Sequence, residues 1–238
     1  FWIKILLYNK GIRMATENLK PGSNSSMQKP LLRYLVKGYL GLGLVYYQKI
    51  EYNVALAHYN SAYKYAVELN EPYFLGDCDF YIAEVYLEQS LHREAMQKYK
   101  EAIAQYEKAK SLDGVYWSYA GMGIVQKQSG NFSDAILCYN KALKVASEAG
   151  MKNEEAYCFN NLGNVYRKQG DFAKAMEAYQ KAITKFNVLN DKLAASDCLN
   201  NIGNLYLDNG DPFRALEYYN KSVSFPEVRN DNYRMIIR

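Results

Sequence analysis

Apolar side chains recur three and four residues apart along most of the chain, and short stretches with polar residues or glycine interrupt them. The stretch from about 153 to 168 has one apolar stripe, which predicts an amphipathic helix. Its apolar residues are Phe159, Leu162, Val165 and Tyr166. The helix is expected to end at Gly170, which can take a left-handed backbone conformation, and Asp171 is placed to cap the next helix. Since a second apolar stripe follows, the pattern predicts a helical hairpin. The residues of this second stripe are Ala175, Tyr179, Ala182, Ile183 and Phe186.

The hairpin pattern returns with a period of 40 residues. Two positions are the same in every copy, and they are Ala55, Ala95, Ala135, Ala175 and Ala215, and Tyr59, Tyr99, Tyr139, Tyr179 and Tyr219. Five copies are predicted, over 36–75, 76–115, 116–155, 156–195 and 196–225. One hairpin cannot bury its own apolar face, so the copies are expected to stack on one another. The predicted fold class is all-α, an α-α superhelix (solenoid) of antiparallel helical hairpins.

The repeated residues resemble the tetratricopeptide repeat. The family signature is matched by Phe159, Leu162-Gly163, Tyr166, Ala175, Tyr179 and Ala182, and again by Leu199, Ile202-Gly203, Tyr206, Ala215, Tyr219 and Ser222. The commonest form of the family repeats every 34 residues, and the 40-residue variant is similar to the repeats of peptide-binding polarity adaptors and of Rap/PlcR-type receptors. The resemblance implies a protein-interaction scaffold.

Both ends of the chain depart from the repeat. Residues 1–35 are expected to form a degenerate helical hairpin with a loop, and 21–30 is the one linker-like stretch, because it holds Pro21, Gly22 and Pro30. The apolar residues 1–8 are too few to span a bilayer and are expected to pack against residues 34–44. Residues 226–238 are predicted to begin a further repeat or to form a C-terminal cap.

Composition fits a chain of packed helices with a mixed surface. The 24 Tyr residues are explained mainly by the repeat, in which Tyr179 is expected to fill space around the small Gly163 and Ala175. The net charge is +4, and Lys residues alternate with Glu residues along the helices. Such a mixed surface does not favour nucleic-acid binding.

No residue pattern indicates catalysis or a metal. Cys78, Cys158 and Cys198 share one repeat position that elsewhere holds Gly or Ser, so we expect them to be buried, reduced packing residues, as in a cytoplasmic protein. His58 and His92 belong to no metal-spaced cluster or nucleophile motif. The chain is therefore predicted not to be an enzyme, and to need no cofactor.

The candidate binding residues lie on the first helix of each hairpin. Those of the later copies are Asn160, Asn164, Arg167, Asn200, Asn204 and Asp208. In the resembled family this face lines a concave groove, and a carboxamide can pair with both groups of a peptide unit. The alternative is that these asparagines are solvated residues copied by duplication. The Lys of the family's carboxylate clamp is absent, because Asn160 and Asn200 stand at its position.

The same face is more apolar in the earlier copies. Its residues there include Leu40, Leu44, Phe80, Glu84, Trp117 and Lys127. A partner with a hydrophobic anchor and an extended polar stretch would fit this gradient. The alternative is that the N-terminal helix covers Leu40, Leu44 and Phe80.

The leading hypothesis is a scaffold that binds a peptide or helical segment of a partner protein in the groove. Two alternatives stay open: a peptide-sensing module of a larger signalling protein, and a structural subunit that uses its outer faces in an assembly. Neither nucleic-acid binding nor membrane insertion is expected.

Overall fold

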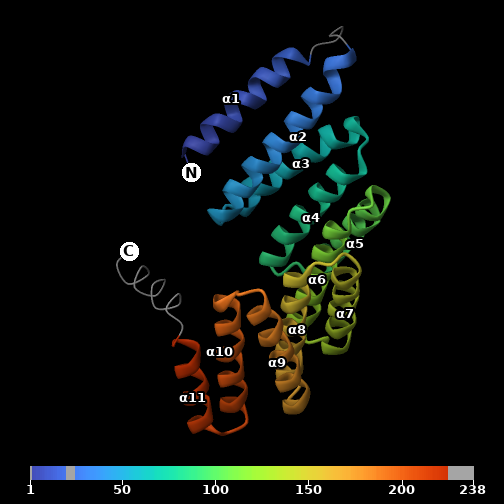
Figure 1. The fold of residues 1–238 in the computed structure, drawn as a ribbon. Coiled ribbons are helices and arrows are strands. Elements are labelled where there is room, and N and C mark those ends of the chain that lie inside the picture. The colour runs from blue at the N-terminus through green and yellow to red at the C-terminus, as the bar shows by residue number, and fades with distance from the viewer. Residues whose placement is uncertain (1, 20–24, 225–238) are drawn as a thin grey trace. The chain divides into compact units, whose positions relative to one another are not determined.

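The computed structural model describes residues 2–19 and 25–224. In these residues the chain forms eleven helices and no strand (Figure 1). The helices are α1 (Trp2–Asn18), α2 (Ser25–Gln48), α3 (Tyr52–Leu69), α4 (Pro72–Glu88), α5 (His92–Ala109), α6 (Leu112–Gln128), α7 (Phe132–Glu148), α8 (Lys152–Lys168), α9 (Phe172–Val188), α10 (Lys192–Asp208) and α11 (Pro212–Ser222). The chain divides into two compact units, residues 1–125 and 126–238.

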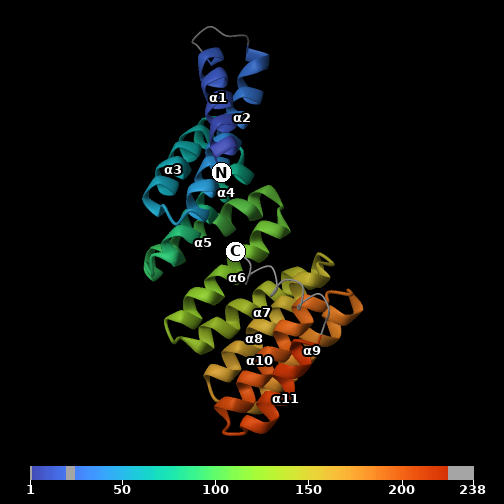
Figure 2. The ribbon, with the colours of Figure 1, turned by 90° about the vertical axis from the view of Figure 1, so that its left-hand side faces the viewer.

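Consecutive helices pair as hairpins within each unit. In the first unit α2 packs on α3 and α4 on α5, and in the second α8 packs on α9 and α10 on α11. The hairpins also contact one another, through α3 and α4 in the first unit and through α9 and α10 in the second. Figure 2 shows α7 to α11 stacked beside each other. The expected all-α fold of stacked helical hairpins is therefore confirmed.

A residue with a left-handed backbone recurs every 20 residues, always in the turn between two helices. These residues, with φ between 55° and 80°, are Ile50, Asn70, Ser90, Lys110, Gly130, Gly150, Gly170, Asn190 and Gly210. Turns inside a hairpin and links between hairpins thus share the same left-handed residue, and the 40-residue repeat consists of two equal halves. Gly170 ends α8 as predicted, since its N–H bonds the carbonyl of Arg167 at 3.0 Å.

Aspartates cap three helices of the second unit. The carboxylate of Asp171 accepts a hydrogen bond from the backbone N–H of Lys174 at 3.1 Å, as the sequence predicts. Asp191 and Asp211 make the same bond at the starts of α10 and α11.

The N-terminal helix packs on α2, which confirms the contact expected for residues 1–8. Ile5 shares a buried cluster with Leu35 and Leu42, and a Cβ at Gly41 would lie 2.4 Å from the ring of Tyr8. Close approach of the two helices therefore requires glycine at position 41.

The alternative that the N-terminal helix covers Leu40, Leu44 and Phe80 can be compared with the packing of these residues. Leu40 packs in a cluster with Phe74 and Ile82 of α4, and Leu44 is 39% exposed. The alternative that the N-terminal helix covers Leu44 is therefore wrong.

The expected linker over 21–30 is also wrong in its second half. Helix α2 begins at Ser25 and contains Pro30, and residues 27–30 are exposed. A proline near the start of a helix removes few hydrogen bonds, so Pro30 does not prevent the helix from beginning earlier. Residues 21–24, and the predicted further repeat or cap over 226–238, lie outside the described residues.

The core of the second unit is built from small residues that face tyrosines. A Cβ at Gly163 would lie 2.6 Å from the ring of Tyr179, and one at Gly203 would lie 2.4 Å from the ring of Tyr219. Tyr179 is fully buried, as is Ala175. The predicted packing of Tyr179 around small residues is confirmed.

All four cysteines are buried, as the repeat position of Cys78, Cys158 and Cys198 predicts for these three, and none of the four is assigned to a disulfide. Cys198 donates a hydrogen bond to the side-chain oxygen of Asn160 at 3.4 Å. Within the described ranges, no group of His, Cys, Asp or Glu side chains is arranged to hold a metal ion.

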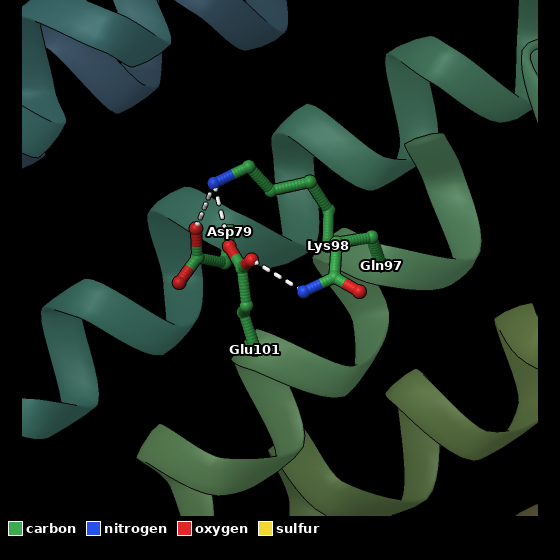
Figure 3. A network of polar contacts seen from close by, with 4 residues as sticks. All are labelled: Asp79, Gln97, Lys98 and Glu101. Atoms are coloured by element: carbon green, nitrogen blue, oxygen red, sulfur yellow. Dashed lines mark hydrogen bonds and ion pairs between the residues drawn. The ribbon is translucent and has the colours of Figure 1, made fainter. Parts of the chain in front are cut away.

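The first unit contains a buried ion pair between α4 and α5. Asp79 is 1% exposed, and its carboxylate lies 2.8 Å from the ammonium of Lys98 (Figure 3). Lys98 also pairs with Glu101 at 2.8 Å, and Gln97 donates to Glu101. The chain thus supplies a cation for the most buried carboxylate of this unit.

Candidate functional site

Helices α4, α5 and α6 of the first unit enclose a cavity of about 420 Å³. Three residues predicted for the groove, Phe80, Glu84 and Trp117, line it together. The first two project from α4, and Trp117 projects from α6 and is 44% exposed. We call this space the α4–α6 cavity.

The other residues that line this cavity were missed by sequence reasoning. Among them are Tyr73, Asp77, Tyr106 and Asp113. Their repeat positions carry no common residue type: position 77 corresponds to Trp117, Tyr157 and Asp197 in later copies. A search for repeated residues finds packing positions, so it passes over a cavity whose walls differ from copy to copy.

Each carboxylate of the α4–α6 cavity accepts a hydrogen bond from an aromatic side chain. The hydroxyl of Tyr106 donates to Asp77 at 2.8 Å, and the indole N–H of Trp117 donates to Asp113 at 3.2 Å. The hydroxyl of Tyr99 donates to Glu84 in the same way. These bonds fix the direction of all three acidic groups, and each engages one carboxylate oxygen.

Two carboxylates of the cavity, those of Asp77 and Glu84, are held in an unfavourable electrostatic environment. Burial raises the pKa of Asp77 to about 6, and the negative charge of Asp113 contributes, although the Tyr106 hydrogen bond acts in the opposite direction. Burial likewise raises the pKa of Glu84. Titratable groups with strongly shifted pKa values in a cleft are typical of functional sites.

A second hollow of about 350 Å³ adjoins this cavity. It shares Tyr73, Asp77 and Tyr81 with the α4–α6 cavity, and Leu40 and Leu44 of α2 form an apolar part of its wall. The earlier copies of the repeat therefore do present an apolar and aromatic face, as the sequence predicts. The acidic groups beside that face were not predicted, apart from Glu84.

The predicted groove residues of the second unit are largely engaged within the chain. The hydroxyl of Tyr179 donates to the side-chain oxygen of Asn164 at 2.8 Å, and Tyr219 donates to Asn204 at the same distance. Because each hydroxyl holds the carbonyl oxygen, the amide N–H₂ group of each asparagine is the end left to meet a ligand. The predicted pairing with both groups of a peptide unit stays a prediction.

The remaining asparagines differ from each other. The side-chain oxygen of Asn160 accepts a hydrogen bond from Asn201 at 3.0 Å, which ties α8 to α10, whereas Asn200 is exposed. Asn160 therefore has a role in packing, whereas Asn200 at the same repeat position is exposed.

Basic groups gather on the same helices. Arg167 lies 3.3 Å from Asp208, as their expected common face indicates, and its buried Nε atom has no hydrogen-bond partner among the described residues. Burial and the positive charges of Lys168 and Arg167 lower the pKa of Lys127. Arg167 and Lys168 of α8 are thus close enough to Lys127 of α6 to act on its charge.

No helix in the described part of the chain is long and apolar enough to cross a membrane.

Solved structures with this fold include several helical repeat proteins. BtubC (BKLC) from P. vanneervenii is 19% identical, with a TM-score of 0.79 over 97% of this chain and 91% of that one. A Rap protein complexed with the competence and sporulation factor is 16% identical, with a TM-score of 0.68 over 92% of this chain and 63% of that one. The Rap conjugation regulator of plasmid pLS20, in complex with the Phr* peptide, is 19% identical, with a TM-score of 0.67 over 88% of this chain and 58% of that one. This chain therefore spans less than two thirds of either Rap protein.

No curated protein matches the sequence. The family model of the tetratricopeptide repeat matches residues 78–148 and 152–227, which together make up more than half of the chain. The resemblance drawn from the repeated residues is confirmed, and the chain belongs to the tetratricopeptide repeat family.

Proposed function

We propose that this chain is a protein-interaction module that holds an extended segment of a partner protein against the first helices of its hairpins. The observation that carries the proposal is the α4–α6 cavity, where Phe80, Glu84 and Trp117 meet and where hydrogen bonds fix the polar groups. Preorganised polar groups among exposed aromatic rings are the usual composition of a protein-binding hot spot.

Two further observations support a peptide segment as the ligand. The Rap structures that share the fold are complexes with a factor and with a peptide. In the second unit, Asn164 and Asn204 lie one repeat apart with their amide N–H₂ groups free of the tyrosine bonds, so they could donate to successive carbonyl groups of an extended chain.

The proposal is tested by selection of peptides from a random display library on the purified protein. We expect a family of sequences to be enriched, and the Trp117→Ala variant to bind them at least ~10-fold more weakly, since buried aromatic anchors contribute about 2 kcal/mol or more. Phe213→Ala is the matched control, because Phe213 is 87% exposed and lies outside the cavity. Circular dichroism should show equal helicity for both variants.

Two results would refute the proposed function. One is the failure of any sequence to be enriched. The other is enrichment of peptides that bind the Trp117→Ala and wild-type proteins equally.

A further inference from the structure

We infer that the α4–α6 cavity receives a basic side chain, arginine or lysine, of the bound segment. This inference rests on the proposed function, and it names the chemical group of the bound segment that the cavity contacts. It is argued from the charge of the cavity, from its aromatic walls and from the partners of the other carboxylates on α4.

The walls of the α4–α6 cavity are acidic and contain no basic residue. Asp77, Glu84 and Asp113 line it, and no Lys, Arg or His does among the described residues. Each carboxylate is oriented by a tyrosine or tryptophan donor rather than by a cation. The cavity therefore has negative potential and fixed acceptors.

Two acidic residues at the start and in the first half of α4 are paired with the chain's own cations, whereas Glu88 at its end accepts a hydrogen bond from the hydroxyl of Tyr52. Asp79 binds Lys98 at 2.8 Å, and Glu71 forms an ion pair with Arg33. Asp77, two residues before Asp79 on the same helix, accepts from Tyr106. Lys37 of α2 lines the adjoining hollow and lies 5.9 Å from the ring of Phe74, and its positive charge lowers the pKa of Asp77, in opposition to burial. The chain thus neutralises carboxylates nearby but leaves those of the cavity to an external cation.

The aromatic rings distinguish an organic cation from a metal ion. Tyr73, Phe80, Tyr81 and Trp117 line the same space, and the faces of such rings attract guanidinium and ammonium groups. The carboxylates do not converge as metal ligands, since no such group is found in the described ranges. A volume of about 420 Å³ suits one long side chain with its adjacent backbone and is too small for a helix.

The free protein also has an electrostatic reason to accept a cation. The charge of Asp113 contributes to raising the pKa of Asp77, so these acidic groups repel each other across the cavity. A bound guanidinium or ammonium group would remove that repulsion and would satisfy the remaining carboxylate oxygens. Arginine could bind two of them at once, because its donors form a rigid fork.

The experiment uses small probes that carry a single side chain. Nα-acetyl-arginine amide is titrated into the protein, and the uncharged Nα-acetyl-citrulline amide serves as the isosteric comparison. The chain has two tryptophans, Trp2 and Trp117, so a Trp2→Phe background makes the fluorescence report on the cavity alone. We expect saturable binding of the arginine probe in the millimolar range, and binding of the citrulline probe at least ~10-fold weaker.

Conservative variants assign the binding to the cavity. The double variant Glu84→Gln and Asp113→Asn keeps both hydrogen-bond acceptors and removes two charges, so the arginine probe should bind it at least ~10-fold more weakly. Glu107→Gln is the matched control, because Glu107 is exposed on α5 and lies outside the cavity lining. Lys37→Gln should strengthen binding, since it removes a competing positive charge beside the cavity.

The outcomes separate this inference from the proposed function. Equal binding of both probes, or unchanged binding to the double variant, overturns the inference. Selected peptides that need Trp117 but carry no basic residue would overturn the inference and leave the proposed function standing. Binding of the arginine probe without any selected peptide would show that the cavity binds a guanidinium group, but it would refute the proposed function and, with it, the claim that this group belongs to a bound segment.

Discussion

Replacing Asp77 by asparagine should make the protein more stable at neutral pH. Asp77 is largely buried, and its pKa is raised from the ordinary 3.8 to about 6, chiefly by burial. Asparagine has nearly the same shape, keeps the oxygen that accepts from the hydroxyl of Tyr106, and carries no charge to be desolvated. The variant therefore removes the cost of holding a carboxylate at this position.

The magnitude follows from proton linkage. Because the folded protein holds the proton more tightly than the unfolded chain, stability attributable to Asp77 is greatest below pH 3.8 and is lost as the pH rises through about 6. Each tenfold change in the acid dissociation constant corresponds to about 1.4 kcal/mol, so the charged carboxylate lowers the free energy of unfolding at pH 7.5 by at most about 3 kcal/mol. Solvent in the cavity reduces this difference, so we expect the variant to gain about 1–2 kcal/mol in free energy of unfolding at pH 7.5 and about a third of that at pH 4.5.

Urea unfolding followed by circular dichroism measures this gain at the two pH values. Other titrating groups are common to both proteins, so the difference between variant and wild type isolates Asp77. Glu107→Gln is the control variant, because Glu107 is exposed on α5 and lies outside the cavity lining. A gain of equal size at both pH values, or a loss of stability at pH 7.5, would refute the reasoning.

Two further variant pairs test the packing. Tyr179→Phe should lower the free energy of unfolding by about 1 kcal/mol, because it removes a hydrogen bond. Tyr139→Phe should be neutral or stabilising, because the buried Tyr139 hydroxyl has no partner among the described residues. Thermal unfolding that shows equal losses for the two variants would contradict this. Lys98→Met should cost about 3–5 kcal/mol at pH 7, since it leaves the buried Asp79 unpaired, and less at low pH, because burial raises the pKa of Asp79. The exposed pair of Lys181 provides the control, and Lys181→Met should change the free energy of unfolding by no more than about 0.5 kcal/mol.

The fold could be predicted from the sequence because packing repeats. Ala175 and Tyr179 recur in every copy, and each is fully buried, so one period locates the core of every hairpin. Helix starts were less predictable. Pro30 was interpreted as part of a linker, yet a proline near the exposed start of α2 interrupts little.

The candidate site was predictable only in part, and for a physical reason. Phe80, Glu84 and Trp117 were expected on one face, because helical spacing places them there. Asp77 was missed although it holds the repeat position of Trp117, because the residue type at that position changes from copy to copy, and Asp113 was missed because its place depends on how α4 and α6 meet.

The tyrosine at the invariant repeat position shows how packing and binding are connected in this protein. Its hydroxyl reaches the first helix 15 residues earlier, where it holds Glu84 from Tyr99, Asn164 from Tyr179 and Asn204 from Tyr219. The ring is fixed by the core in every copy, whereas the residue it orients changes from acid to amide. The tyrosine of the core therefore orients a carboxylate in one copy and an amide in two others. For this reason the residues at this variable position, rather than the invariant ones, are where the partner's chemistry should be sought.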